Sequence, residues 1–327
     1  MTWREDRHQI LAPWSILLFT GIFAVAFWIK AFITPAIGIF PAEKSILFYY
    51  LTEHIEYNSL ASKGIAFLLV VLIAVVTFFA NNKYFFIKKK SALLILFMVL
   101  LMGLSDPSHN LNPGIIGLVF LLIAFIRFLS MQGKQYSGSQ AFDIGLYIAI
   151  GSMFYTRMLF FMPIFYIGFY MYQQLHLKNI LATFFGTSFP YILVGTISFL
   201  IGDFNNFLYR LHFSLPETPY VKIGHLIYFG LLGLVALLAF MQFIGNFNNE
   251  KIKTRNTIGF IYLLLAASIA SALFSPHIFL FEIPFISFFL SMLFAHFFAT
   301  NTSKFARILF YVFWIVAIIW FLMSFIL

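Results

Sequence analysis

Long apolar runs separated by short polar segments make up most of the chain. Eleven of these runs approach the roughly 20 residues that a helix needs to cross a bilayer. The pattern therefore predicts an all-α fold, a polytopic transmembrane helical bundle of about 11 spans, in which the runs at 91–105, 141–156 and 158–174 are the short ones. The other eight cover residues 15–34, 64–80, 114–130, 180–201, 225–245, 258–275, 278–298 and 307–327.

Composition indicates that lipid is the solvent of this chain. Of its 327 residues, 62% are hydrophobic and 9% are charged, whereas a soluble domain has about 25% charged residues. This difference excludes a soluble globular enzyme and a disordered protein. No hydrophilic stretch is long enough for a second domain, so residues 1–327 are expected to form a single integral membrane domain. The absence of Cys excludes disulfides and thiol chemistry.

The basic residues predict the orientation of the chain, because Lys and Arg gather in the cytoplasmic loops of membrane proteins. With the N-terminus in the cytoplasm, 14 of the 20 basic residues fall inside and 5 outside, and Lys30 lies near the end of the first run. Those outside are Lys44, Lys63, Arg157, Arg210 and Lys222. Those inside are Arg4, Arg7, Lys83, Lys88, Lys89, Lys90, Arg127, Lys134, Lys178, Lys251, Lys253, Arg255, Lys304 and Arg307. Topology thus explains the positive charge, and no nucleic-acid partner is expected.

Two alternatives compete with this topology. A single long span over 141–174 would move every later loop to the other side and leave 10 basic residues inside against 8 outside. The charge rule therefore favours a hairpin there. A cleaved signal peptide is the second alternative, because Ala24-Val25-Ala26 resembles a cleavage site. The apolar run continues past that site through Trp28, which favours an uncleaved anchor.

The two long loops, at about 35–63 and 202–224, both fall on the outer side. Within the first, Ser45–Tyr57 is expected to form a short helix on the membrane surface, with Glu53 and Glu56 three residues apart on one face. This pair has two interpretations. It is either a pair of carboxylates able to act as a general base or to hold a metal, or the solvated face of an interfacial helix.

Further polar residues on the outer side are candidates for a second acid and for substrate binding. Asp106 and His109 lie in a tight turn whose composition also needs no function. Arg157 lies at the tip of the 141–174 hairpin, where a guanidinium either reaches the interface or grips a lipid phosphate. Arg210 and His212, in the second long loop, allow the same two interpretations.

Three remaining features bear on the chemistry. Glu282, just before Pro284, is expected near the outer interface, and Asp143 is interpreted as an acid at a helix N-terminus. The eight His residues are too far apart in sequence to show the spacing of a metal-binding motif. The two that lie closest together are His212 and His225. Neither a metal site nor a cofactor is therefore predicted.

Part of the chain resembles a known family. Residues 141–173 (AFDIGLYIAIGSMFYTRMLFFMPIFYIGFYMYQ) and 179–195 (NILATFFGTSFPYILVG) are similar to an uncharacterised family of multi-pass bacterial membrane proteins, a domain of unknown function. The similarity rests on Phe142-Asp143, on the step Gly151–Tyr155, and on Gly186 with Pro190. It implies a multi-pass protein of the bacterial inner (plasma) membrane. Members sometimes carry a carotene monooxygenase label, which the His spacing does not support.

A looser similarity is to the membrane glycosyltransferases that use polyprenyl-phosphate sugars. These enzymes have a cytoplasmic N-terminus and acidic residues in a first outer loop, which would correspond to Glu53 or Glu56 as the base and Asp106 as a second acid. The acid pair that normally follows their first span is replaced by Thr34-Pro35-Ala36. This similarity implies transfer of a sugar from a lipid phosphate.

Two functions remain open from the sequence. One is cell-envelope glycan or lipid assembly by lipid-linked glycosyl transfer on the outer face. The other is a non-catalytic membrane subunit, scaffold or lipid-handling component of an envelope complex. Membrane lipids, a polyprenyl-phosphate-linked substrate and other membrane proteins are the expected partners. An enzyme should bring Glu53, Glu56, Asp106 and an arginine to one cavity open to lipid, whereas a scaffold should leave them scattered.

Overall fold

The computed structural model describes residues 13–33, 45–57, 59–87, 92–134, 136–211, 223–245, 250–273, 279–301 and 303–323. These residues form thirteen α-helices and two 3-10 helices. The helices are α1 (Pro13–Ile33), α2 (Ile46–His54), α3 (Leu60–Tyr84), α4 (Leu93–Gly103), η2 (Asp106–His109), α5 (Pro113–Leu129), α6 (Gly138–Phe154), η3 (Thr156–Phe160), α7 (Phe161–Met171), α8 (Leu177–Ile201), α9 (Phe204–Arg210), α10 (Ile223–Gly245), α11 (Ile252–Leu273), α12 (Phe279–Thr300) and α13 (Lys304–Met323).

The all-α fold predicted from the apolar runs is confirmed, and each of the eleven runs coincides with a helix. Among the described residues, five helices are long and apolar enough to cross a membrane: α3, α8, α11, α12 and α13. The two long loops of the predicted topology contain the short helices α2 and α9. The predicted surface helix over 45–57 is shorter than expected, because α2 ends at His54 and the backbone at Ile55 is extended.

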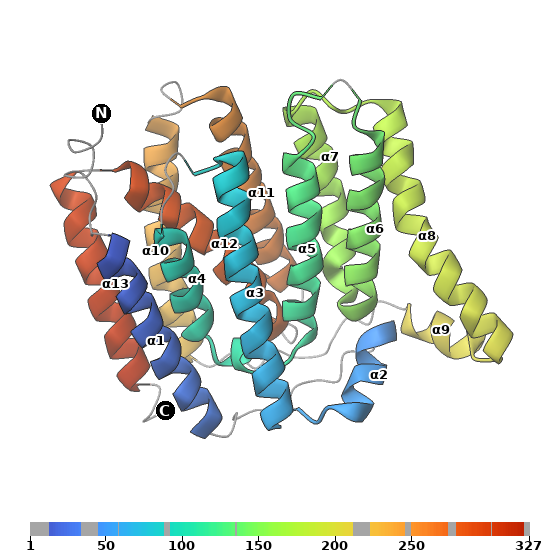
Figure 1. Cartoon of the computed structure of the whole chain (residues 1–327), viewed down its shortest axis with the longest axis horizontal. Helices are drawn as coiled ribbons and strands as arrows, with labels where there is room; N and C mark the ends of the chain where they lie inside the picture. The colour runs from blue at the N-terminus through green and yellow to red at the C-terminus, as the bar shows by residue number, and fades with distance from the viewer. Residues whose placement is uncertain are drawn as a thin grey trace.

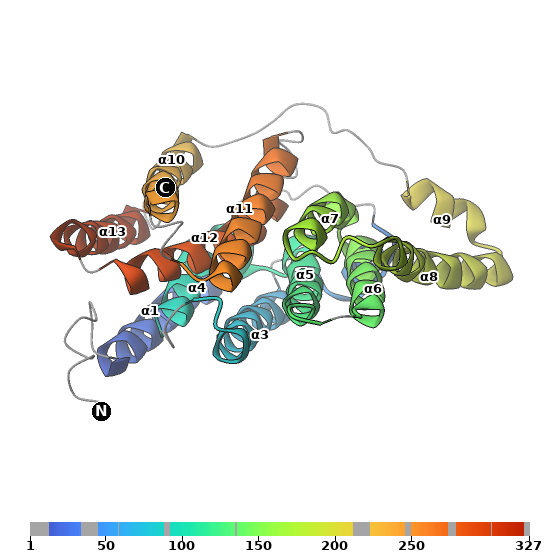
Figure 2. The same ribbon diagram turned by 90° about the horizontal axis from the view of Figure 1, so that it is seen from above.

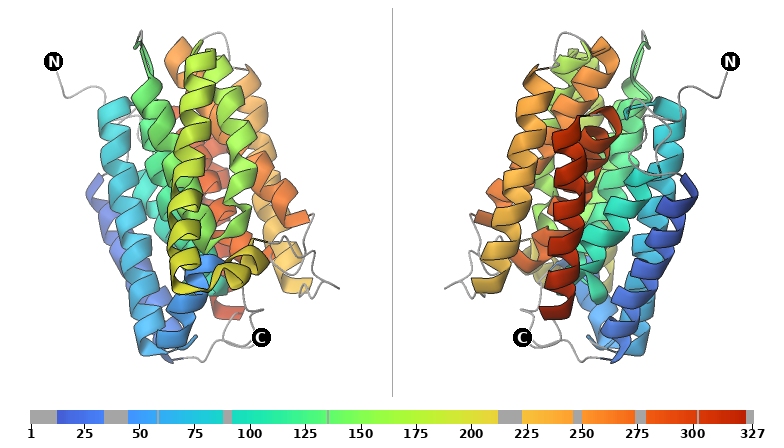
Figure 3. Two further views of the ribbon diagram at one scale, coloured as in Figure 1. Left: turned by 90° about the vertical axis from the view of Figure 1, so that its right-hand side faces the viewer. Right: turned by 90° about the vertical axis from the view of Figure 1, so that its left-hand side faces the viewer.

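The helices run up and down a bundle, so that successive connections alternate between its two ends (Figures 1 and 3). At one end, α3 leads to α4, α5 to α6, α7 to α8, α10 to α11, and α12 to α13. Basic residues mark this end, which we call the basic end: Lys83, Arg127, Lys178, Lys253 and Lys304 lie in the last or first turns of helices there. The opposite end carries α2, η2 and α9, and we call it the α2–α9 end.

The outside of the bundle is covered by large apolar side chains. On α1 a stripe at helical spacing is more than half exposed: Leu18, Ile22, Val25, Ile29 and Ile33. The same holds on α13 for Ile308, Tyr311, Ile315, Ile319 and Leu322. Such surfaces are unfavourable in water and fit lipid tails. Figure 2 shows α8 and α9 at one edge of the bundle, where much of α8 is exposed.

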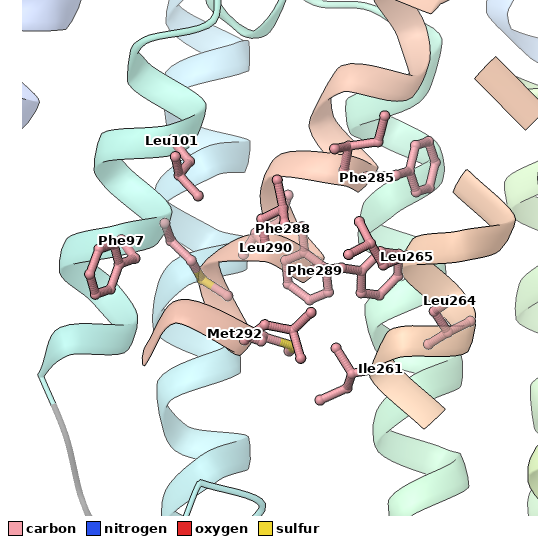
Figure 4. Packing of buried hydrophobic residues seen from close by; sticks show 14 of the residues in the cluster. Phe97, Leu101, Ile261, Leu264, Leu265, Phe285, Phe288, Phe289, Leu290 and Met292 are labelled. Carbon is pink, nitrogen blue, oxygen red and sulfur yellow. The ribbon is translucent and has the colours of Figure 1, made fainter. Parts of the chain in front are cut away.

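The centre of the bundle is α12, which contacts α4, α5, α10, α11 and η2. Figure 4 shows Phe285, Phe288 and Phe289 of α12 between Phe97 of α4 and Leu264 of α11. These three α12 rings are fully buried. A helix that is apolar all round is expected to be buried, and α12 has this character except for Glu282, two serines, His296 and the final Thr300.

Helices α6 and α8 cross at two glycines. A Cβ added to Gly145 would lie 2.1 Å from the carbonyl oxygen of Thr183, and one added to Gly186 would lie 2.1 Å from that of Phe142. Small residues allow helix backbones to approach closely in a membrane, where packing holds the helices together. The backbone contact therefore requires glycine at both positions.

We expect Gly186→Ala to lower the stability of the protein by roughly 1–3 kcal/mol, because the new methyl group meets backbone that cannot move without separating α6 from α8. Gly64→Ala, in α3, is the matched control, since a Cβ there meets no atom within 4 Å. It should be neutral or slightly stabilising, because alanine favours a helix more than glycine does. Thermal unfolding in one detergent compares the two. Equal melting temperatures would contradict the proposed close crossing.

Candidate functional site

The α2–α9 end brings an arginine onto aromatic rings. The guanidinium carbon of Arg210 lies 3.7 Å from the ring centre of Tyr49 and 5.5 Å from that of Tyr50, which are cation–π contacts. The Tyr50 hydroxyl donates to Oδ2 of Asp203 at 3.4 Å, and Asn206 donates to Oδ1 of the same carboxylate. Together these five residues, from α2, from α9 and from the position just before α9, form what we call the Arg210 platform.

An apolar groove of about 560 Å³ lies beside the platform, between α8 and α9. Phe207 and Leu211, which flank Arg210 in sequence, line it. The complete lining is Tyr191, Ile192, Gly195, Thr196, Phe199, Phe204, Phe207 and Leu211. Nη1 of Arg210 is buried and has no hydrogen-bond partner among the described residues. A cation with an unused donor therefore lies on the same short helix as two of the aromatic residues that line the groove, Phe204 and Phe207.

The acidic candidates of the first long loop lie at the same end but point to solvent. Glu53 and Glu56 are both exposed. Glu53 follows Tyr49 by one helical turn and so shares its face of α2. Glu56 lies beyond the end of α2, so the expected common helical face of the two carboxylates is not formed. His212 lies outside the described residues.

A second group of polar side chains is buried where α6, η3, α11 and α12 meet, and we call it the Glu282 cluster. Oε1 of Glu282 accepts hydrogen bonds from the Tyr155 hydroxyl at 2.6 Å and from Oγ of Ser271 at 2.5 Å. Nη1 of Arg157 donates to the Ser271 carbonyl oxygen at 3.0 Å. The charge of Arg157 also acts on the Glu282 carboxyl. Ser271 therefore bridges the buried guanidinium of Arg157 and the buried carboxyl of Glu282.

The directions of Arg157 and Glu282 differ from the sequence-based expectation. Arg157 is 5% exposed and points into the bundle, and Glu282 has no exposed surface. After α6 the backbone is extended at Tyr155, and the chain then turns through η3 directly into α7. Arg157 lies in this turn and points inward, where the Ser271 carbonyl oxygen of the distant helix α11 accepts its hydrogen bond. Both groups are held in the interior by hydrogen bonds, Arg157 to Ser271 and Glu282 to Ser271 and Tyr155.

The turn at 106–113 packs against α12 through η2. His109 is buried, with Nε2 2.8 Å from the Gly103 carbonyl oxygen and its ring 5.1 Å from that of Trp28. Asp106 begins η2, but its side chain is outside what the structure describes. Asp143 lies in the second turn of α6 and forms an ion pair with Arg127 at 3.3 Å. The sequence predicted that Asp143 stabilises the N-terminus of a helix. In the structure it forms this ion pair near the basic end.

The predicted site residues are thus divided between separate places. Arg210 belongs to the platform, Arg157 to the Glu282 cluster, and His109 to the packing of η2. In the described part of the chain, no three His, Asp or Glu side chains lie close enough to hold a metal ion.

The sequence did not indicate a role for Tyr49, Tyr155 and Ser271, which contact Arg210, Glu282 and Arg157. Tyr and Ser are common in such helices, and only the contact with the charged side chain distinguishes these three residues. The step Gly151–Tyr155 was the available signal for one of them. Its Ser152 bonds the Tyr191 hydroxyl at 2.5 Å, and its Tyr155 bonds Glu282.

The fold, with several long apolar helices around a buried central one, is that of a multi-pass membrane protein. The chain belongs to the family of unknown function DUF6427, whose model matches residues 36–327. This agrees with the similarity to an uncharacterised family, and the comparisons give no support to the glycosyltransferase similarity. No curated protein and no solved structure matched the chain.

At alkaline pH, where Glu282 is ionised, we expect Arg157→Met to lower the free energy of unfolding by about 3–5 kcal/mol, because it leaves the buried carboxylate without its compensating charge. Glu282→Gln should cost a similar amount for the converse reason. The double variant should recover much of the loss, since no buried charge then remains. Unfolding of the four proteins in one detergent gives the coupling energy. Simple addition of the two losses would show that the charges are independent.

Proposed function

We propose that the protein is an inner-membrane protein of eleven spans that handles a phosphate-bearing lipid on the outer face, as a non-catalytic component of cell-envelope glycan or lipid assembly. Support for the spans comes from the eleven helices, whose connections alternate between the two ends of the bundle. The gathering of basic residues at one end supports a cytoplasmic location for that end. The Arg210 platform and the apolar groove then lie outside.

The observation that carries this proposal is the position of Arg210. Its guanidinium rests on Tyr49 with Nη1 unused among the described residues, and the groove beside it is lined by apolar side chains. Guanidinium groups match phosphate oxygens in geometry, and an apolar groove open to the bilayer suits a lipid chain. This end of the protein thus offers a cation for the phosphate group and an apolar groove for the hydrocarbon chain of a phosphate-bearing lipid.

The arrangement favours lipid handling over glycosyl transfer. Transfer needs a carboxylate base near the acceptor and a cation at the leaving phosphate. Arg157, one of the two candidate arginines, is buried and bonded to Ser271, and Glu56 lies beyond the end of α2. The two exposed glutamates instead form part of a solvated surface around the platform.

Arg210→Gln is expected to weaken binding of polyprenyl phosphate by about tenfold or more, because charge-assisted hydrogen bonds to phosphate contribute about 1.5–3 kcal/mol. Native mass spectrometry of the purified protein, titrated with polyprenyl phosphate, phosphatidylglycerol and phosphatidylcholine, measures the affinities. The first two separate a monoester from a phosphodiester headgroup, and the third shows whether net negative charge is required.

Arg307→Gln is the matched control, because Arg307 is exposed on α13 at the basic end and should leave binding unchanged. Gly195→Leu tests the groove, since the added side chain enters space lined by Phe207 and should weaken binding without changing the charge. Equal affinity of the wild type and of Arg210→Gln for all three lipids would refute the proposal.

A further inference from the structure

The Glu282 cluster contains a fully buried carboxyl, which the packing of apolar helices does not require. Glu282 lies in the first turn of α12, has no exposed surface, and neighbours the buried rings of Phe281 and Phe285. Acidic side chains inside membrane segments are costly, and those that occur commonly belong to proton or ion pathways. The cluster is separate from the Arg210 platform and its lipid groove, so this inference does not depend on the proposed function.

The two oxygens of the Glu282 carboxyl are used unequally. Oε1 receives both donors, the hydroxyls of Tyr155 and Ser271. Oε2 is buried and has no hydrogen-bond partner among the described residues. A proton that binds to Oε2 therefore breaks no hydrogen bond, and both donors stay on Oε1 in either protonation state.

The charges around Glu282 act in opposite directions. Burial among apolar rings makes a charged carboxylate costly, whereas the guanidinium of Arg157 compensates its charge through Ser271. Other titratable groups on the packed elements lie elsewhere or are engaged. His109 of η2 faces the Gly103 carbonyl oxygen, and the basic residues of α5 and α11 lie at the basic end. Arg157 and Tyr155 are thus the ionisable groups that face the carboxyl in the described part of the chain.

We propose that Glu282 is a reversible proton-binding site inside the membrane, with Oε2 as the atom that takes the proton and Arg157 as a fixed counter-charge. The proton comes from water and returns to water, and one O–H bond forms and breaks. The net charge of the Arg157–Glu282 pair changes from zero to plus one. Because Ser271 belongs to α11 and Tyr155 joins α6 to η3, the change acts directly on the hydrogen bonds that link α12 to α11 and to the end of α6.

Infrared difference spectroscopy on the full-length protein in nanodiscs tests this proposal. As the pH is stepped from acidic to alkaline, the carbonyl band of one protonated carboxyl should disappear, and it should shift in heavy water. Glu282→Gln should remove this band. Glu53→Gln is the matched control, because Glu53 is exposed on α2, and the band should remain in that variant.

Tyr155→Phe keeps the carboxyl and the ring but removes one donor to the ionised form. The midpoint of the band should then move to higher pH by about one pH unit, which corresponds to one hydrogen bond to a charged group. This variant keeps the test decisive if Glu282→Gln does not fold. A wild-type spectrum without a titrating buried-carboxyl band would overturn the proposal. So would a band whose midpoint is the same in Tyr155→Phe as in the wild type.

Discussion

Lipid tails offer no hydrogen-bond partners, and this constraint governs the structure. Every backbone group in the apolar region must be satisfied within its own helix, and the polar side chains must find one another. Ser152 therefore bonds Tyr191, and Tyr155 bonds Glu282. The result differs from a soluble protein at its surface: exposed apolar stripes on α1, α8 and α13 surround an apolar interior in which a few hydroxyls, a carboxyl and a guanidinium are hydrogen-bonded. The same constraint fits the position of α12, which carries the buried acid and is the most enclosed of the five long helices.

The Arg210 platform and the Glu282 cluster are both fastened to the end of α6. Oγ of Ser45, just before α2, donates to the Phe154 carbonyl oxygen at 2.7 Å. Ser152, two residues earlier, bonds Tyr191 in the wall of the groove, and Tyr155, the next residue, holds Glu282. Four consecutive residues thus connect a surface site with a buried one. A movement of α6 would therefore displace residues of both the Arg210 platform and the Glu282 cluster.

The helices were predictable because the period and length of apolar runs are local properties. All eleven runs became helices, and the surface helix at α2 was expected, although it ends at His54. The directions of charged side chains were not predictable, because they depend on distant partners. Arg157 faces inward because Ser271 lies 114 residues away in sequence but 3.0 Å away in space. Glu282 is buried because Tyr155 and Ser271 supply its donors. For Arg210, the sequence indicated a phosphate-binding cation. Its contact with Tyr49 could not be predicted, because the two residues belong to different long loops that come together only in the folded protein.

The orientation of the two bundle ends is the claim on which the functional account depends, and it can be measured directly because the chain has no native Cys. Single variants Glu53→Cys and Arg307→Cys place one thiol at each end, since both positions are exposed. A membrane-impermeant maleimide is applied to intact spheroplasts and, separately, to permeabilised ones. The account predicts that Glu53→Cys is labelled in both samples and that Arg307→Cys is labelled only after permeabilisation. Labelling of Arg307→Cys in intact spheroplasts, with Glu53→Cys protected, would contradict it.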